Sequence, residues 1–267
     1  MPWYQALFLG IFQGIAEFIP VSSSGHLVII QHLFNIELES DALAAFDVIL
    51  HAGSLLALLI YFRKTWLRVW RNICNHLCGK GDKIEAPIVR HLVVGTAPIL
   101  IIGYLLHHYI EEYFSDPQLV LVFMFILGLV FISAEHWPKA KNRKNMSIKN
   151  SFLVGCAQAI ALIPGISRSG STITAAMWQG INRQTAAEFS FILGTPALIA
   201  ATSYVGLQIF MGDMPSPPLT ASIIGFISSF IVSWFCLKFL LKFLQKHSLR
   251  PFAYYLLIFS SIMFFVI

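Results

Sequence analysis

Two polar segments repeat each other, 145 residues apart, inside a chain that is otherwise apolar. The first is GIFQGIAEFIPVSSSGH at residues 10–26, and the second is GCAQAIALIPGISRSGST at residues 155–172. At this offset the identical pairs include Gly10 and Gly155, Gln13 and Gln158, Ala16 and Ala161, Ser22 and Ser167, Ser24 and Ser169, and Gly25 and Gly170. A serine-rich backbone broken by glycine is tolerated at membrane depth only where it is buried in protein or lines a cavity. The repeat therefore predicts that the polar chemistry of this chain lies in these two segments.

The composition predicts a membrane protein built of helices. Hydrophobic residues make up 57% of the chain and charged residues only 12%, about half the charged fraction of a soluble domain. Apolar runs long enough to cross a bilayer as a helix predict six spans, at residues 43–62, 88–109, 117–137, 186–211, 218–241 and 251–267. The N-terminus lacks the pattern of a cleavable signal peptide, so the first apolar stretch is expected to stay. We therefore expect an all-α polytopic membrane fold with no nucleic-acid partner.

The basic residues predict the sidedness of this fold. Sixteen of the eighteen Lys and Arg residues lie in three stretches, 63–90, 139–149 and 238–250, which the positive-inside rule places in the cytoplasm. Residues 1–35 and 151–182 then each start and finish on one side of the membrane, as re-entrant helical hairpins that enter from opposite faces. The expected result is one membrane domain, residues 1–267, with an inverted-topology repeat. Half one is 1–137, a cytoplasmic linker is 138–150, and half two is 151–267.

The predicted hairpins place three ionisable side chains where they cannot snorkel to water: Glu17, His26 and Arg168. Charge at membrane depth indicates a functional site by default. Arg168 carries a permanent, fork-shaped charge that binds a carboxylate or a phosphate, so Glu17 could be its structural partner or part of a catalytic set. Ser23, three residues before His26, offers a nucleophile near a base. The segment 165–170, followed by an apolar helix, predicts a phosphate cradle at a helix N-terminus.

Asp47 and His51 lie one helical turn apart on the first predicted span. They could support the polar site from behind, or they could face a polar interior of the helix bundle. The sequence leaves both interpretations open.

At these residues the sequence resembles the undecaprenyl-diphosphate phosphatase family, also called the bacitracin-resistance protein family. The resemblance rests on two motifs, Gln13-x-x-x-Glu17 leading to PVSSSGH at 20–26, and PGISRSG at 164–170, and it covers essentially the whole chain. It implies an integral membrane enzyme that removes the terminal phosphate from undecaprenyl diphosphate, recycling the carrier lipid for peptidoglycan and other envelope polymers. It also implies a divalent cation, Mg²⁺ or Ca²⁺, and a bacterial plasma (inner) membrane location with the active site facing the periplasm or cell exterior.

The resemblance also implies residue roles. Ser23 looks like the nucleophile, His26 and Glu17 the acid–base pair, and Arg168 the diphosphate clamp, with Glu17 as the expected metal ligand. The expected substrate-binding residues are Gln13, Ser22, Ser24, Ser167, Ser169, Gly170 and Thr172. Many family members carry Glu where this chain has Gln13, so Glu17 is expected to take more of that role here.

Two alternatives to this interpretation remain open. Water could attack the diphosphate directly, with Ser23 as a ligand only. A lipid flippase or anion transporter could be built on the same inverted repeat, although a transporter needs Arg168 and has no use for the Ser23 and His26 pair. The sequence also leaves open whether the chain forms a homodimer.

Overall fold

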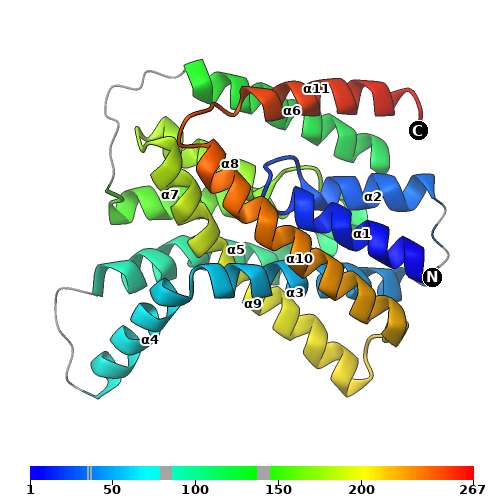
Figure 1. Ribbon diagram of the computed structural model, residues 1–267, viewed down its shortest axis with the longest axis horizontal. Coiled ribbons are helices and arrows are strands. Elements are labelled where there is room, and N and C mark those ends of the chain that lie inside the picture. Colours follow the sequence, from blue (N-terminus) through cyan, green and yellow to red (C-terminus); the bar gives the residue numbers. More distant parts are fainter. Residues whose placement is uncertain (35, 37, 79–85, 137–144) are drawn as a thin grey trace.

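The computed structural model describes residues 1–34, 36, 38–78, 86–136 and 145–267, and every regular element within those ranges is a helix (Figure 1). The predicted linker 138–150 therefore falls largely outside the described residues. The helices are α1 (Trp3–Ala16), α2 (Ser23–Leu33), α3 (Ser40–Tyr61), α4 (Arg63–Leu77), α5 (Ala86–Phe114), α6 (Pro117–His136), α7 (Ile148–Ile160), α8 (Arg168–Trp178), α9 (Arg183–Met211), α10 (Leu219–Phe243) and α11 (Arg250–Phe264).

Five helices are long and apolar enough to cross a membrane, which confirms a multi-pass fold. Their apolar segments are Asp41–Tyr61, Ile88–Leu106, Pro117–His136, Arg183–Met211 and Leu219–Phe243, and each overlaps one predicted span. The sixth predicted span, 251–267, corresponds to α11, which has only 15 residues. That is shorter than the roughly 20 residues a spanning helix needs, so a sixth crossing stays a prediction.

The sequence repeat is also a repeat of local structure. Helices α2 and α8 each have 11 residues and begin at Ser23 and Arg168, at the offset of the sequence repeat. Each is preceded by a serine whose side chain caps it: Ser22 Oγ accepts from Gly25 N at 3.2 Å, and Ser167 Oγ accepts from Gly170 N at 3.1 Å. The N-terminus and the end of α2 lie on the same side of the bundle (Figure 1). The helix pair α1 and α2 thus turns back inside the molecule.

Small residues let the short helices approach the long ones closely. A Cβ at Gly10 of α1 would lie 2.6 Å from the Gly225 carbonyl oxygen of α10, and a Cβ at the equivalent Gly155 of α7 would lie 2.9 Å from the Gly95 carbonyl carbon of α5. Close backbone approach through small residues is how membrane helices pack. The repeat glycines are therefore packing positions.

A hydroxyl cluster joins α3 to α10. Ser54 Oγ lies 3.1 Å from Ser229 Oγ and 2.8 Å from Ser233 Oγ, and Ser229 Oγ donates to the Leu50 carbonyl at 2.7 Å. All three serines are buried. Because α1 also packs on α10, these contacts hold α1 and α3 together around the residues described below.

An ion pair between a half-buried arginine and a buried glutamate joins three segments far apart in the sequence. The Arg183 guanidinium, at the start of α9, forms two hydrogen bonds with the Glu135 carboxylate near the end of α6, one of them from Nε at 2.9 Å. Glu135 is 6% exposed and also accepts from the Leu249 backbone N–H at 2.9 Å. The pair thus ties α6 and α9 to the entry of α11.

We expect Arg183→Met to destabilise the fold strongly, because it removes both hydrogen bonds that the Arg183 guanidinium makes with the buried Glu135 carboxylate. Breaking one side of a buried pair costs about 3–5 kcal/mol, which corresponds to a Tm lowered by on the order of 10 °C. Thermal unfolding in detergent measures this, with the exposed Arg250→Met as the matched control. The double variant Arg183→Met with Glu135→Met should recover much of the loss. A Tm equal to that of the Arg250 variant would contradict a stabilising role for the pair.

Candidate active site

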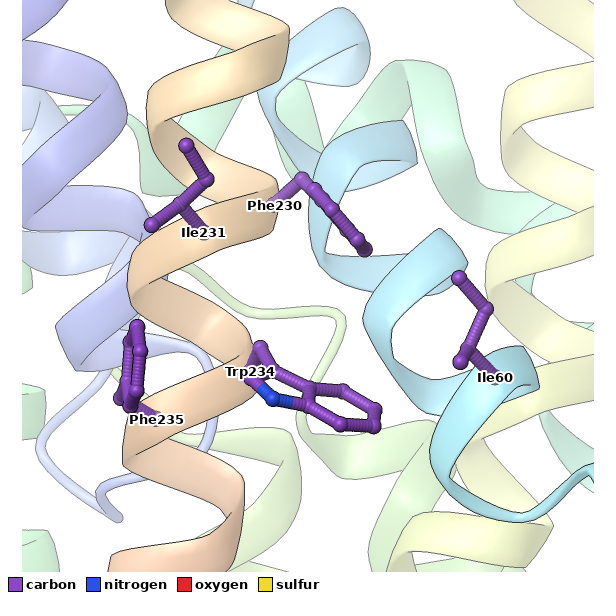
Figure 2. Close-up of a pocket in the computed structure, with 5 residues that line it drawn as sticks. All are labelled: Ile60, Phe230, Ile231, Trp234 and Phe235. Carbon is purple, nitrogen blue, oxygen red and sulfur yellow. The ribbon is translucent and has the colours of Figure 1, made fainter.

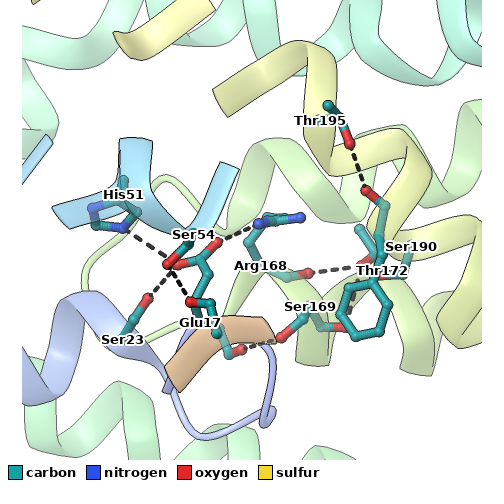
Figure 3. Close-up of polar contacts among 12 residues, drawn as sticks. Glu17, Ser23, His51, Ser54, Arg168, Ser169, Thr172, Ser190 and Thr195 are labelled. Carbon is teal, nitrogen blue, oxygen red and sulfur yellow. Dashed lines mark hydrogen bonds and ion pairs between the residues drawn. The ribbon is translucent and has the colours of Figure 1, made fainter. Parts of the chain in front are cut away.

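Glu17 is the centre of the polar cluster formed by the two repeat segments (Figure 3). It follows the last residue of α1 and is 6% exposed. Its Oε2 atom accepts from Gln13 Nε2 at 3.0 Å and from Ser23 Oγ at 2.9 Å, and it lies 3.4 Å from His51 Nε2. Its Oε1 atom accepts from Arg168 Nη2. One carboxylate therefore contacts groups from α1, α2, α3 and α8.

A strained turn aims Ser23 at this carboxylate. Ser22 has φ of +72°, the only positive φ at a non-glycine residue in the described ranges. Such a conformation persists only where the surroundings hold it, and it is found preferentially at functional sites. Ser22 is held by its Oγ bond to Gly25 N. Ser23 then opens α2 with a half-buried hydroxyl that donates to Glu17.

Arg168 reaches the same carboxylate from the other half of the chain. It is the first residue of α8, and its neighbour Ser167 caps the helix. Its Nη2 atom donates to Glu17, whereas Nη1 is buried without a hydrogen-bond partner. A Cβ at Gly194 of α9 would lie 2.5 Å from the guanidinium carbon of Arg168, so Gly194 provides the space in which the guanidinium sits. An unpaired, buried cationic N–H beside a helix N-terminus is suited to bind an anion.

No hydrogen bond joins the His26 and Ser23 side chains, in contrast to the predicted nucleophile–base pair. Its Nδ1 atom lies 2.8 Å from the Ser22 carbonyl oxygen, and its Nε2 atom lies 2.7 Å from the Tyr255 hydroxyl. Because a carbonyl only accepts, we assign the proton to Nδ1, with Tyr255 donating to Nε2. The ring also stacks on Phe259 at a centroid distance of 4.7 Å. Both nitrogens are therefore occupied, one of them in holding the Ser22 turn.

His51 faces the site, which settles one of the open alternatives. It lies within 3.4 Å of Glu17 Oε2, while Asp47 Oδ1 accepts from Gln31 Nε2 at 2.7 Å. The sequence left open whether His51 supports the polar site or faces a polar bundle interior. In the structure His51 contacts Glu17.

The remaining predicted substrate-binding residues lie around this cluster and differ in how deeply they are buried. Ser167, Ser169 and Thr172 are buried, and Ser24 is half-buried. Ser167 Oγ and Ser169 Oγ lie 3.2 Å apart. The Thr172 hydroxyl donates to the Arg168 carbonyl at 2.8 Å and contacts Ser190 of α9. Thr172 therefore has protein partners and supports Arg168 from behind, while Gly170 packs its Cα face against Phe131.

The site offers few ligands for a divalent cation. Among the described residues no group of three or more His, Cys, Asp and Glu side chains could hold a metal. The oxygen donors near Arg168 are the Glu17 carboxylate and Gln13 Oε1, which is buried without a hydrogen-bond partner. Mg²⁺ is commonly held by one or two protein oxygens completed by substrate phosphates. The residues present fit that kind of shared site and do not build a complete one.

An apolar groove lies between α3 and α10, and its lining has no groups suited to catalysis or metal binding (Figure 2). Its volume is about 230 Å³, and it is lined by Ile60, Phe230, Ile231, Trp234 and Phe235. The Lys238 ammonium lies 4.0 Å from the Trp234 ring centroid. The groove has no carboxylate, serine or arginine in its lining, so the Glu17 cluster is the candidate active site.

Comparison with known proteins agrees with the two motifs and the site they form. The family model described as "Bacitracin resistance protein BacA" matches residues 6–262. This chain belongs to the BacA family. Curated relatives include undecaprenyl-diphosphatase 4 of Bacillus cereus, 35% identical over 96% of this chain and 93% of its own length. The undecaprenyl-diphosphatase of Pelotomaculum thermopropionicum is 39% identical over 85% of this chain and 86% of its own. The BacA match includes both polar segments and all five apolar spans.

We expect Tyr255→Phe to lower turnover, because Tyr255 is the partner of His26 Nε2 and His26 holds the Ser22 turn. Loss of one hydrogen bond costs about 0.5–1.5 kcal/mol, so kcat should fall between about twofold and tenfold with KM little changed. Tyr254→Phe, next in sequence and 54% exposed, is the matched control. Equal kcat for the two variants would show that the bond to His26 does not position Ser23.

Proposed function

We propose that this chain hydrolyses undecaprenyl diphosphate to undecaprenyl phosphate and inorganic phosphate, recycling the carrier lipid for peptidoglycan and envelope polymers. The family supports the substrate, since relatives that align over nearly the whole chain are named undecaprenyl-diphosphatases. The observation that carries the proposal is the shared carboxylate of Glu17, which accepts from the Ser23 hydroxyl and from Arg168. A nucleophile, a base and an anion-binding cation thus meet at one point.

The diphosphate would bind on the α8 side of this point. The unpartnered Nη1 of Arg168 and the N-terminus of α8 would neutralise its charge, which is the main requirement of phosphoryl transfer. The Glu17 carboxylate would turn from Arg168 towards Ser23 as the substrate takes the guanidinium. The substrate phosphate would replace Glu17 as the partner of the Arg168 guanidinium. This exchange needs no large movement of the helices.

Glu17 would then act as the general base in place of His26. In the covalent route, the Ser23 hydroxyl transfers its proton to Glu17 while its oxygen bonds to the distal phosphorus. The anhydride bond breaks, and undecaprenyl phosphate leaves. Glu17 passes that proton to the leaving undecaprenyl phosphate and is ionised again. It then accepts a proton from the water that attacks the phosphoserine, and returns it to the Ser23 oxygen as inorganic phosphate leaves. In the direct route, water replaces Ser23 as the attacking group, and Ser23 only orients it.

A divalent cation would supply charge neutralisation on the diphosphate when bound. Mg²⁺ or Ca²⁺ would take Glu17 and Gln13 Oε1 as protein ligands, with substrate oxygens completing the coordination. The amide at Gln13 contributes no charge, so the ion would depend on the substrate for most of its anionic ligands.

The finer topology belongs to the same proposal. We infer six crossings and two re-entrant hairpins in inverted halves, with the active site opening to the periplasm or cell exterior of the plasma membrane. The support is the equal offset of α2 and α8 and the three basic stretches. Cysteine accessibility at residues 38–42 and 145–149 from the two sides of the membrane tests it. Labelling of both from the same side would overturn the arrangement.

Purified protein in detergent tests the function. Incubation with undecaprenyl diphosphate should release phosphate and undecaprenyl phosphate in equal amounts, with Mg²⁺ or Ca²⁺ present and not with EDTA. No release by folded protein would refute the hydrolase and favour a transporter of lipid or anions.

A further inference from the structure

Helix α4 carries apolar side chains that the rest of the described chain does not cover. Leu67 is 65% exposed and Trp70 66% exposed, whereas Val69 on the adjoining face is buried at 6%. Helix α4 contacts α5 and α3 along a narrow edge. One strip of this helix therefore packs on the bundle and the neighbouring strip is open.

The open strip is bordered by positive charge. With 3.6 residues per turn, Leu67, Trp70 and Cys74 lie on one face with Arg63 at its N-terminal end, and Lys64, Arg68 and Arg71 lie along its edge. The sequence of α4, RKTWLRVWRNICNHL, contains no acidic residue. A helix with one apolar face, a basic edge and a tryptophan is typical of helices that lie in the membrane interface.

The chain fixes where this helix must lie. The spanning helix α3 ends at Tyr61 and α4 begins at Arg63, so only Phe62 separates them. A helix that begins one residue beyond a span begins at the membrane surface. Figure 1 shows α4 leaving the end of α3 obliquely and running away from the other helices. No other part of the chain that the structure describes covers its open strip, and a helix that begins there is placed to lie against the lipid headgroups.

We propose that α4 is a binding site for an anionic membrane leaflet. Leu67 and Trp70 enter the boundary between headgroups and acyl chains, and Lys64, Arg68 and Arg71 pair with lipid phosphates. Each such basic residue strengthens binding to an anionic surface about fivefold. A zwitterionic lipid also has a phosphate but no net negative charge, so it attracts the basic edge more weakly and the helix distinguishes the two surfaces. This inference does not depend on the proposed hydrolase activity.

Quenching of Trp70 by brominated lipids tests the proposal in the full-length protein. The emission of Trp70 is obtained as the difference between the wild-type protein and its Trp70→Phe variant, both reconstituted in bilayers. One set of bilayers contains phosphatidylcholine only, and the other contains phosphatidylglycerol. We expect stronger quenching of Trp70 in the anionic bilayers, and loss of that difference at high salt.

Two triple variants separate the α4 site from general surface charge. Lys64→Gln, Arg68→Gln and Arg71→Gln together should abolish the extra quenching. Lys242→Gln, Lys246→Gln and Arg250→Gln remove the same charge from exposed positions at the end of α10 and the start of α11, and should leave it intact. Trp70 unquenched in both bilayers would mean that water or a protein partner covers the strip. Equal quenching in both bilayers, or an equal effect of the two triple variants, would refute recognition of anionic lipid by α4.

Discussion

Glu17→Gln is expected to abolish most phosphate release, lowering kcat by about 10²- to 10⁴-fold, the usual contribution of a general base. The reason is that one carboxylate serves several groups at once. It accepts from Ser23 and Arg168 and lies within 3.4 Å of His51. A glutamine retains the shape but cannot take a proton from Ser23, and its NH₂ group would face a donor.

Glu17→Asp is the conservative counterpart to this variant. It keeps the charge that Arg168 needs and shortens the reach to Ser23, so it should retain part of the kcat that the glutamine loses. The measurement is the rate of phosphate release at saturating substrate, with circular dichroism to confirm the fold. Equal rates for Glu17→Gln and the wild type would exclude Glu17 as the base, and would return the choice to His26 or to His51.

Gly194→Ala is expected to lower kcat/KM by on the order of 10²-fold, although position 194 carries no chemical group. A Cβ there would lie 2.5 Å from the guanidinium carbon of Arg168, so the guanidinium must move. A displacement of about 1 Å of a binding group costs on the order of 100-fold in rate. The loss should appear in substrate binding as well as in turnover, because Arg168 is the proposed diphosphate ligand.

The same helix provides the control for this variant. Gly206 lies in α9, twelve residues beyond Gly194, and a Cβ there would meet nothing within 4 Å. Gly206→Ala should therefore leave the rate within a factor of about two, since it changes helix propensity without a clash. If both alanine variants were equally active, the space at Gly194 would not be what positions Arg168.

Hydropathy and charge predicted those parts of the fold that depend on moving helices from water into lipid. Five spans were located within a few residues because a crossing helix must be apolar along its length. The sixth was drawn to residue 267 because the C-terminal residues are apolar, whereas α11 ends at Phe264. Helix α4 was not predicted. The basic residues of 63–90 indicated a loop between two spans, and the helical spacing of the apolar residues among them was not recognised.

The site was predicted only where opposite charges require each other. The sequence offered Glu17 either as a structural partner of Arg168 or as part of a catalytic set, and the structure joins the two side chains. Short separation in sequence suggested that His26 serves Ser23. In the structure the imidazole instead hydrogen-bonds Tyr255 and stacks on Phe259, both in α11. No local pattern could indicate that pairing, or the space that Gly194 leaves for Arg168.

The central claim is that one residue set, contributed by both halves of the chain, hydrolyses the lipid diphosphate. The most direct measurement compares phosphate release from undecaprenyl diphosphate by the wild type, Ser23→Ala and Arg168→Ala in the presence of Mg²⁺. Ser222→Ala, at a half-buried serine of α10 whose hydroxyl donates to the Pro218 carbonyl, is the control. We expect metal-dependent release by the wild type and by the control, and near-complete loss in the other two. Full activity of either the Ser23 or the Arg168 variant would contradict the account.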